Sequence, residues 1–370
     1  MKASDVFTPG GYPSVTLVND HIEQKKCQLL NTLKSGGIAV SLSGPSKSGK
    51  TVFVQNSIEK DDLIIVNAAG VTSAEMLWKR VFAHIGTPIA KNIVHTKGIS
   101  HTASGNISGG MNFLVAKGNA GGSLSRSSVT SDTTTDENVN DYLQILINEL
   151  KDTGMILFID DFHYMSRDIQ SEVAKQIKEA IRNDIKIVCA SVPYHAGDTI
   201  AANPDLSGRI VSINFDFWKE DLLIKIAEKG FSQLNVHCDI PFLLKLAREA
   251  AGSPQLMQYI CLYACSEAGI EETRLENIIL PTSDEFLKKV CTYAAATAQF
   301  KQIYETMKEG PKIRGKQRTS YVLKDGFAYD VYPIILKAIA AEPPNLTFRY
   351  SDLQKRIGNI CENETQVVPV

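Results

Sequence analysis

An eight-residue segment of this chain carries the residue types that bind a polyphosphate. It reads GPSKSGKT and fits the pattern G-x-x-x-x-G-K-[ST] at every position. Glycines let the backbone turn back on itself, so that its N–H groups point inward at phosphate oxygens. Lys50 can then reach the β- and γ-phosphates, and Thr51 can offer its hydroxyl to Mg²⁺. Val52 follows Thr51 directly and is also a candidate nucleotide-binding residue. The eight residues are Gly44, Pro45, Ser46, Lys47, Ser48, Gly49, Lys50 and Thr51.

An apolar run, Met155 to Ile159, ends in two adjacent carboxylates, Asp160 and Asp161. A strand buried on both faces delivers its last side chains to the carboxyl edge of a parallel sheet, where a phosphate loop also lies. We therefore assign Asp160 to Mg²⁺ and Asp161 to the orientation of an attacking water. Acids also open ordinary loops after strands, so the assignment depends on the phosphate loop earlier in the chain.

Three further polar residues follow or precede expected strands. Ser191 ends a strand, where it can sense the γ-phosphate or simply close a turn. Arg209 precedes the last strand, where it can reach a neighbouring subunit's nucleotide or be an ordinary surface arginine. His163 can contact substrate or support its loop, and we favour support. None of these three roles is decided by the sequence.

Short apolar strands alternate with amphipathic helices through the first part of the chain. This alternation indicates an α/β fold with a parallel sheet covered by helices on both faces. A stretch at 97–135, rich in Gly, Ser and Thr, interrupts it as an inserted loop or weak hairpin. The expected strands are 38–42, 63–67, 155–159, 185–190 and 210–215, and the expected helices are 21–33, the helix through Ile58, 73–85, 138–151 and 167–182.

The chain after Asp216 has only helical periodicity, so we expect no further strand there. The expected helices are 218–234, 241–251, 254–268, 283–306, 331–341 and 349–361. The expected domains are an N-terminal segment and helix at 1–35, a core at 36–216, a helical lid at 217–285 and a basic helical region at 286–370.

With these residues in hand, the chain resembles AAA+-type and STAND-type P-loop ATPases, including initiator ATPases and ATPases of bacterial defence and transposition systems. The motifs that carry the resemblance are GPSKSGKT, ILFIDDFHYM, IKIVCASVP, LSGRI and the later GSPQ, within Val6 to Ala268. The resemblance implies a parallel sheet in the order 5-1-4-3-2, a helical lid, and binding of ATP with Mg²⁺. It also implies that the N-terminal segment packs on the adenine, which makes Pro13 and Thr16 candidates for that contact.

Two positions depart from what the resemblance implies. Such ATPases often carry an arginine on the lid where this chain has Gln255, and a neutral amide cannot supply that charge. Many relatives also have glutamate at the position of Asp161. Either Arg209 of a neighbouring subunit compensates, which implies a homo-oligomer, or the protein hydrolyses ATP slowly, as a switch does.

The C-terminal region is the only basic part of a chain whose net charge is −2. Between Leu287 and Ile360 there are thirteen Lys and Arg residues against six Asp and Glu residues. The stretch from Gly326 to Cys361 resembles the beginning of a winged-helix domain. Such charge favours DNA phosphates without base specificity, while a solvated surface, a protein partner or a dimerisation element stay open. The basic side chains considered for this are Lys312, Arg314, Lys316, Arg318, Lys355 and Arg356.

Composition narrows the class of protein. There is no apolar run long enough to cross a membrane and no secretion signal at the N-terminus, and the seven cysteines are scattered, so we expect a cytoplasmic protein with reduced thiols. The leading hypothesis is an oligomerising, ATP-dependent molecular switch with slow, partner-controlled hydrolysis. The alternative is a DNA-binding or initiator-like regulator in which ATP is mainly structural. A small-molecule kinase lacks an evident substrate-binding arginine cluster here, and a GTPase lacks its Asn-Lys-x-Asp segment.

Overall fold

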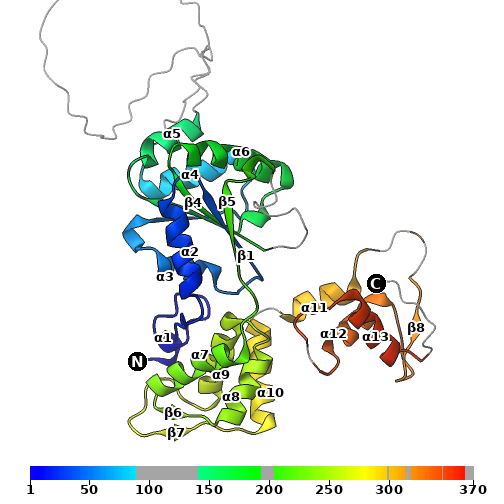
Figure 1. The fold of residues 1–370 in the computed structure, drawn as a ribbon. Helices are drawn as coiled ribbons and strands as arrows, with labels where there is room; N and C mark the ends of the chain where they lie inside the picture. Colours follow the sequence, from blue (N-terminus) through cyan, green and yellow to red (C-terminus); the bar gives the residue numbers. More distant parts are fainter. Residues whose placement is uncertain are drawn as a thin grey trace, which may run out of the picture.

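The centre of the fold is a five-stranded parallel sheet with the strand order β2-β3-β4-β1-β5 (Figure 1). This confirms the order 5-1-4-3-2. The computed structural model describes residues 1–88, 141–192, 204–297, 300–312, 315, 318–343 and 345–362. The strands are β1 (Ala39–Ser43), β2 (Leu63–Asn67), β3 (Ile156–Asp160), β4 (Lys186–Ser191) and β5 (Ile210–Asn214).

Helices cover both faces of this sheet, as the α/β prediction requires. Alternate side chains of each strand point to opposite faces, so Val40 and Leu42 pack with α2 and α3, whereas Leu157 and Ile159 pack with α4, α5 and α6. The helices are α2 (Glu23–Lys34), α3 (Lys50–Ser57), α4 (Ala74–Ile85), α5 (Tyr142–Leu150) and α6 (Arg167–Arg182). Short 3-10 turns are η1 (Lys60–Asp62), η2 (Phe162–Tyr164) and η4 (Pro204–Leu206).

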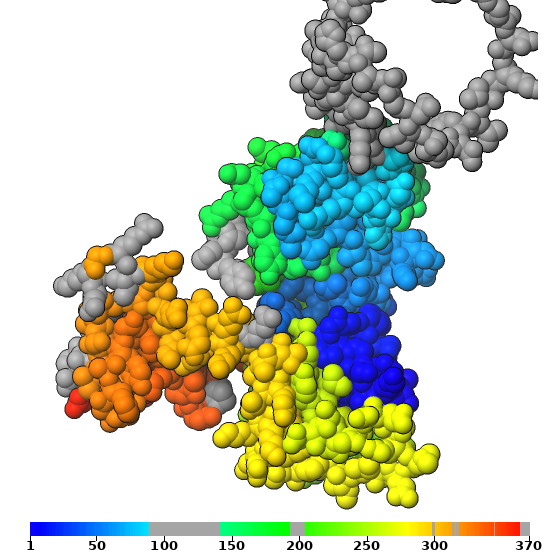
Figure 2. All heavy atoms as spheres, turned by 180° about the vertical axis from the view of Figure 1, so that it is seen from behind, coloured from blue at the N-terminus to red at the C-terminus, as the bar shows by residue number. Residues whose placement is uncertain are grey.

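A helical lid follows the sheet and has a separate hydrophobic core. Phe286, Val290 and Ala294 of α10 are buried in that core, so α10 packs with the lid although most of its residues fall in the expected basic region 286–370. The N-terminal segment enters the same core through Phe7, and Figure 2 shows this segment, in dark blue, between the sheet domain and the lid. The helices are α1 (Ala3–Val6), α7 (Glu220–Gln233), α8 (Ile240–Glu249), α9 (Pro254–Glu267) and α10 (Asp284–Thr297).

One expectation about the chain beyond Asp216 was wrong. Strands do occur there: β6 (Val236–His237) pairs in parallel with β7 (Ile278–Ile279), and β8 (Tyr321–Val322) pairs antiparallel with β9 (Ala328–Tyr329). Each has only two residues, which is too short to show an alternating pattern in the sequence. Most of the expected helix 283–306 is helical, in α10 and α11 (Phe300–Glu309), and residues 298–299 between them lie outside the described residues. The predicted insertion at 97–135 lies outside the described residues.

The C-terminal unit is small and sits to one side of the lid, joined to it through α11 (Figure 1). It combines α11 and the β8–β9 hairpin with α12 (Val331–Ala340) and α13 (Tyr350–Ile360). Its buried residues are Leu323, Ile334, Ala338, Ile357 and Cys361. Within the described residues, no helix combines the length and the apolar character that a bilayer crossing needs.

The contact between Phe7 and α7 gives a direct test of how the N-terminal segment is held. A Cβ atom on Gly230 would lie 2.2 Å from the Phe7 ring, whereas one on Gly358 of α13 would meet nothing within 4 Å. We expect Gly230→Ala to lower the free energy of unfolding of the lid by about 1–3 kcal/mol through overpacking. The matched change Gly358→Ala is expected to be neutral or to stabilise its helix by up to about 1 kcal/mol. Urea denaturation followed by circular dichroism measures both, and equal effects would contradict this packing.

Candidate nucleotide site

The phosphate loop connects the end of β1 to the start of α3, and its two glycines are required by close contacts and backbone angles. A Cβ atom on Gly44 would lie 2.5 Å from the carbonyl oxygen of Phe215. Gly49 has a φ of 94°, in the left-handed region that residues other than glycine rarely adopt, and it is the N-cap residue of α3. The loop therefore turns as the sequence pattern predicts, with the first helical turn of α3 directly behind it.

Lys50 is the first residue of α3, and its ammonium group is held inside the loop. Its Nζ donates hydrogen bonds to the carbonyl oxygens of Gly44, at 2.9 Å, and Pro45, at 2.7 Å. The side chain is only 8% exposed, and burial lowers the pKa of Lys50 against the opposing influence of Asp160 and Asp161. A buried cation that is bonded to neutral carbonyl oxygens can donate instead to the charged phosphate oxygens that enter the loop.

Thr51 and Asp160 meet at the carboxyl edge of the sheet. The Thr51 hydroxyl donates to Asp160 Oδ2 at 2.6 Å, and the backbone N–H of Asp161 donates to Asp160 Oδ1 at 2.9 Å. Burial raises the pKa of Asp160, while the Thr51 hydrogen bond acts in the opposite direction. A hydroxyl and a carboxylate are hard oxygen ligands of the kind that Mg²⁺ takes beside a phosphate. This pair of side chains therefore fits the predicted magnesium site.

Asp161 is held by a residue that the sequence did not suggest. Asn67, the last residue of β2, donates from Nδ2 to Asp161 Oδ2 at 2.8 Å, and its Oδ1 accepts from Ala69 N at 2.7 Å. Asp161 also has a φ of 58°, in the left-handed region that Asp adopts more readily than most residues other than glycine. The signal was present in the sequence, because LIIVN is an apolar strand that ends in a polar side chain, as β3 does.

A cavity of about 450 Å³ brings the predicted residues together, a size that suits a small-molecule ligand. Its walls come from the N-terminal segment, the phosphate loop, the end of β3 and the lid. The predicted residues that line it are Pro13, Thr16, Ser46, Lys47, Ser48, Gly49, Lys50, Thr51, Val52, Asp160 and Asp161. Gln255 lines it too, and the residues that the sequence did not suggest include Tyr12, His21, Trp218 and Gln258.

Trp218 joins the loop to the lid. Its indole Nε1 donates to the carbonyl oxygen of Ser48 at 3.0 Å, and its backbone N–H donates to the carbonyl oxygen of Gly252 at 2.9 Å. Gly252 directly precedes the Ser253–Pro254 start of α9, so one residue contacts both the phosphate loop and the beginning of a lid helix. The position of the lid is thereby tied to the conformation of the loop.

The C-terminal unit also reaches the surroundings of this site. Lys47 Nζ lies 5.6 Å from the centre of the Phe300 ring of α11, within the range of a cation–π contact. On the lid side, a Cβ atom on Gly252 would lie 2.8 Å from Leu346 Cδ1 and 2.7 Å from Phe217 Cβ, so Leu346 packs against this glycine. The C-terminal unit thus contacts the loop and the start of the lid.

Two predicted residues, Ser191 and Arg209, do not line the cavity, and a third, Gln255, lines it with its amide already hydrogen-bonded. Ser191 ends β4 beside the end of β1, but its side chain is 1% exposed and its hydroxyl has no partner among the described residues. Gln255 does line the cavity, yet its Nε2 donates to the carbonyl oxygen of Pro9 at 2.7 Å. Arg209 directly precedes β5 and lies next to Ala39, at the opposite edge of the sheet from the loop. Within one chain Arg209 therefore cannot reach this cavity.

Comparison with solved structures supports the same architecture. A Walker-type ATPase of Pyrococcus abyssi has a TM-score of 0.53 at 14% sequence identity, covering 90% of this chain and 82% of that one. The ORC2 protein of Aeropyrum pernix, in its ADPNP–ADP complexes, has a TM-score of 0.52 at 14% identity, covering 96% of this chain and 82% of that one. This chain has the α/β fold of a P-loop ATPase, with the strand order 5-1-4-3-2. No family model matches its sequence, and no curated protein does.

Proposed function

We propose that this protein binds ATP with Mg²⁺ and hydrolyses it slowly, as a nucleotide-dependent molecular switch of the AAA+ or STAND kind. The observation that carries the proposal is the cavity, in which Lys50, Thr51, Asp160 and Asp161 face a space walled by the N-terminal segment and the lid. A site made from three parts of the chain changes their relative positions when its occupant changes. That property is what a switch requires.

The roles of the site residues follow from their chemistry. Lys50 and the backbone N–H groups of residues 46–49 bind the β- and γ-phosphates. Thr51 and Asp160 hold Mg²⁺, which when bound neutralises charge on the phosphates. Asp161 orients the attacking water, with Ser191 near the γ-phosphate. Pro13 lines the part of the cavity that we assign to the adenine, while the buried Thr16 hydroxyl accepts a hydrogen bond from Gln258 Nε2 at 2.5 Å.

Slow turnover is supported by the uncharged character of the lid residues that line this cavity. All lid residues that line it are neutral: Trp218, Ile226, Pro254, Gln255 and Gln258. The amide of Gln255 is moreover engaged with Pro9. The lid of one chain therefore supplies no positive charge to a γ-phosphate, and phosphoryl transfer without such a charge is slow.

A second subunit can supply the missing charge. Arg209 lies at the sheet edge opposite the loop, where it is available to a neighbouring copy. We therefore propose a homo-oligomer in which Arg209 acts on the neighbour's nucleotide, and a partner that controls turnover through the C-terminal unit, since that unit contacts Lys47 and Gly252. The proposed domains are 1–35, 36–216, 217–285 and 286–370, with α10 packed on the lid.

Two substitutions separate binding from turnover. Lys50→Ala is expected to abolish ATP binding, because it removes the only ammonium group held inside the described loop. Asp161→Asn is expected to keep binding and to lower the hydrolysis rate by at least about 100-fold, since general-base catalysis contributes that much. Equilibrium binding of ATP and release of inorganic phosphate measure the two effects. Unaltered ATP binding by Lys50→Ala would contradict the proposal.

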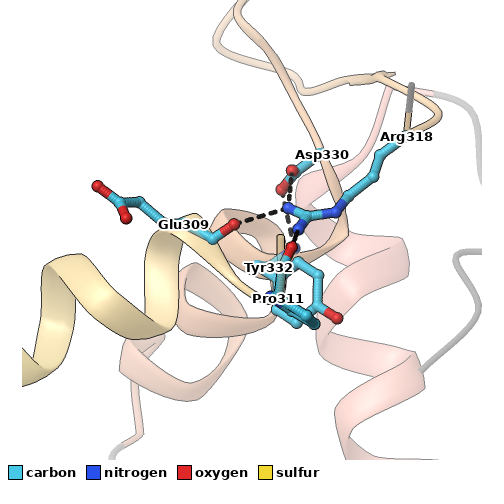
Figure 3. A network of polar contacts seen from close by, with 5 residues as sticks. All are labelled: Glu309, Pro311, Arg318, Asp330 and Tyr332. Atoms are coloured by element: carbon cyan, nitrogen blue, oxygen red, sulfur yellow. Dashed lines mark hydrogen bonds and ion pairs between the residues drawn. The ribbon is translucent and has the colours of Figure 1, made fainter. Parts of the chain in front are cut away.

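A DNA-binding regulator is the second candidate function. The hydrogen bonds within the C-terminal unit limit which of its basic side chains can contact DNA phosphates. Arg318 donates to the carbonyl oxygen of Glu309 at 2.7 Å and to Asp330 Oδ2 at 2.8 Å, and it also bonds the carbonyl oxygen of Pro311 (Figure 3). Arg356 bonds the carbonyl oxygens of Ala341 and Pro343. Both arginines thus hold the unit together, which removes them from the predicted phosphate contacts.

Exposed lysines are left for such contacts. Among the residues that the structure describes, Lys312, Lys324 and Lys355 are exposed and have no carboxylate within ion-pair distance. Arg314 and Lys316 lie outside the described residues. Because α10 belongs to the lid core, a deletion from residue 286 would damage the lid, and charge reversal is the cleaner test.

If the unit binds duplex DNA, Lys324→Glu combined with Lys355→Glu is expected to weaken binding. The salt slope should fall by about 0.9 for each DNA phosphate that the variant no longer neutralises. The matched control is Lys34→Glu with Lys175→Glu, two exposed lysines of the sheet domain. Fluorescence anisotropy over a range of salt concentrations measures the slope. Equal effects of the two double variants, or no binding by the unaltered chain, would rule out this second candidate.

A further inference from the structure

One face of α11 carries four large apolar side chains that remain exposed. Their spacing of i, i+3, i+4 and i+7 places them along one side of the helix, and they are 37% to 52% exposed. They are Phe300, Ile303, Tyr304 and Met307, and we call them the α11 stripe. α11 has 10 residues, all of them described, and none is buried. A helix this short is marginal in water unless its apolar face is packed, so the stripe indicates a surface that another element covers.

Positive charge borders the α11 stripe. Lys301 and Lys308 follow two stripe residues directly, so both lie at the same edge of it. Lys308 is paired with Glu305 at 3.6 Å, whereas Lys301 is exposed and has no carboxylate within ion-pair distance among the described residues. Lys47 adds a further positive charge beside Phe300. The element that covers the stripe should therefore offer an apolar surface bordered by carboxylates.

A second cavity, at the end of the lid that carries β6 and β7, has an apolar surface of this kind. Its volume is about 490 Å³, and its lining includes the buried side chains of Phe231, Val236 and Leu243. Ile240 also lines it and is 71% exposed. Ile279 of β7, which pairs with a lining residue of β6, is 75% exposed. We call this cavity the lid-end hollow.

Carboxylates lie at the border of the lid-end hollow. Glu228 lines it, and Asp239 and Glu276 are each next to a lining residue in the chain. All three are exposed, and the ion pairs described in the lid involve other acidic residues. Lys229, which follows Glu228, donates to the carbonyl oxygen of Leu17. The hollow thus has the apolar lining and the negative charge that complement the α11 stripe.

The α11 stripe and the lid-end hollow lie at opposite ends of the lid. β7 precedes α10 and α11 follows it, and the 14 residues of α10 span about 20 Å. Figure 1 shows β6 and β7 at the end of the lid far from the sheet domain, and α11 near the other end. One chain therefore cannot bring its own stripe to its own hollow. A contact between two different surfaces of identical chains is heterologous, so each copy can use its stripe on one neighbour and its hollow on another.

We propose that the α11 stripe of one copy docks in the lid-end hollow of a second copy. This inference rests on the proposed homo-oligomer, to which it adds a contact that does not involve Arg209. It is separable from ATP binding, because neither the stripe nor the lining of the hollow belongs to the nucleotide cavity.

Two variants each block one side of this contact. Ile303→Glu with Met307→Glu places charge in the stripe and leaves Phe300 beside Lys47. Ile240→Asp places a carboxylate at the hollow, in the first turn of α8, where acidic residues are favourable. We expect each variant to weaken self-association of the full chain by at least about 10-fold. Sedimentation velocity over a range of protein concentrations, with and without ATP and Mg²⁺, measures this. The control Phe327→Glu, at another exposed aromatic residue of the C-terminal unit, is expected to change nothing.

Mixing the two blocked chains gives the sharpest test. An Arg209→Ala background removes the other proposed contact between copies. The Ile240→Asp chain then keeps an intact stripe, and its mixing partner keeps an intact hollow. One contact can form, so we expect a one-to-one complex, and nothing larger, from two chains that are each monomeric alone.

A second pair of variants covers the case in which the first pair does not fold. Lys301→Glu and Glu228→Lys change only exposed side chains, and each reverses one border charge. Each chain alone then meets like charges at the contact. Mixing them restores opposite charges, so we expect self-association to be weakened in the separate chains and recovered in the mixture.

Four results would overturn the proposal. A monomeric unaltered chain under both conditions would mean that a different molecule covers the stripe. Self-association kept by Ile240→Asp but lost on changing the stripe would mean that two stripes pack together. Absence of a complex on mixing, or an equal loss in Phe327→Glu, would also reject the contact. ATP binding by the unaltered chain, measured in parallel, tests the proposed function separately, and its absence would reject that function whatever the assembly result.

Discussion

The ammonium group of Lys50 is buried at the carboxyl end of the sheet, and the phosphate loop and the nearby carboxylates must both accommodate its charge. A charge taken out of water needs hydrogen-bond partners, and here the carbonyl oxygens of Gly44 and Pro45 accept two of the three N–H groups of the ammonium. They can do so only because the loop turns tightly, which requires no side chain on Gly44, where Phe215 lies too close. Asp160 and Asp161, at the end of β3, provide the negative charge that balances the ammonium group of Lys50.

The lid and the N-terminal segment are both connected to this loop through Trp218. Trp218 bonds the loop at Ser48 and the start of the lid at Gly252, and it packs against His21 of the N-terminal segment. The three parts that wall the cavity are therefore mechanically connected at one side chain. A change in the loop can be passed to the lid and, through Phe300 and Leu346, to the C-terminal unit. This connection is the structural basis for the switch that we propose.

Local patterns in the sequence predicted the parallel sheet and the phosphate loop, because apolar strands and the loop motif are encoded in consecutive residues. The strand order came from the resemblance to known ATPases and not from these patterns. Contacts between distant residues were not predictable in this way. The bond from Trp218 to Ser48 spans 170 positions, and the ring contact of Trp218 with His21 also joins residues far apart in the sequence. The two-residue strands β6 to β9 gave no periodic signal. The structural engagement of Arg318 and Arg356 likewise follows from the fold, whereas the sequence offered only their charge.

A structure of the chain with Mg²⁺ and a slowly hydrolysed ATP analogue tests the central claim most directly. The account predicts that Lys50 Nζ leaves the carbonyl oxygens of Gly44 and Pro45 and donates to β- or γ-phosphate oxygens. It also predicts that Thr51 and Asp160 then lie on the metal. A nucleotide bound elsewhere, or one in this cavity with Lys50 still bonded to both carbonyl oxygens, would contradict the account.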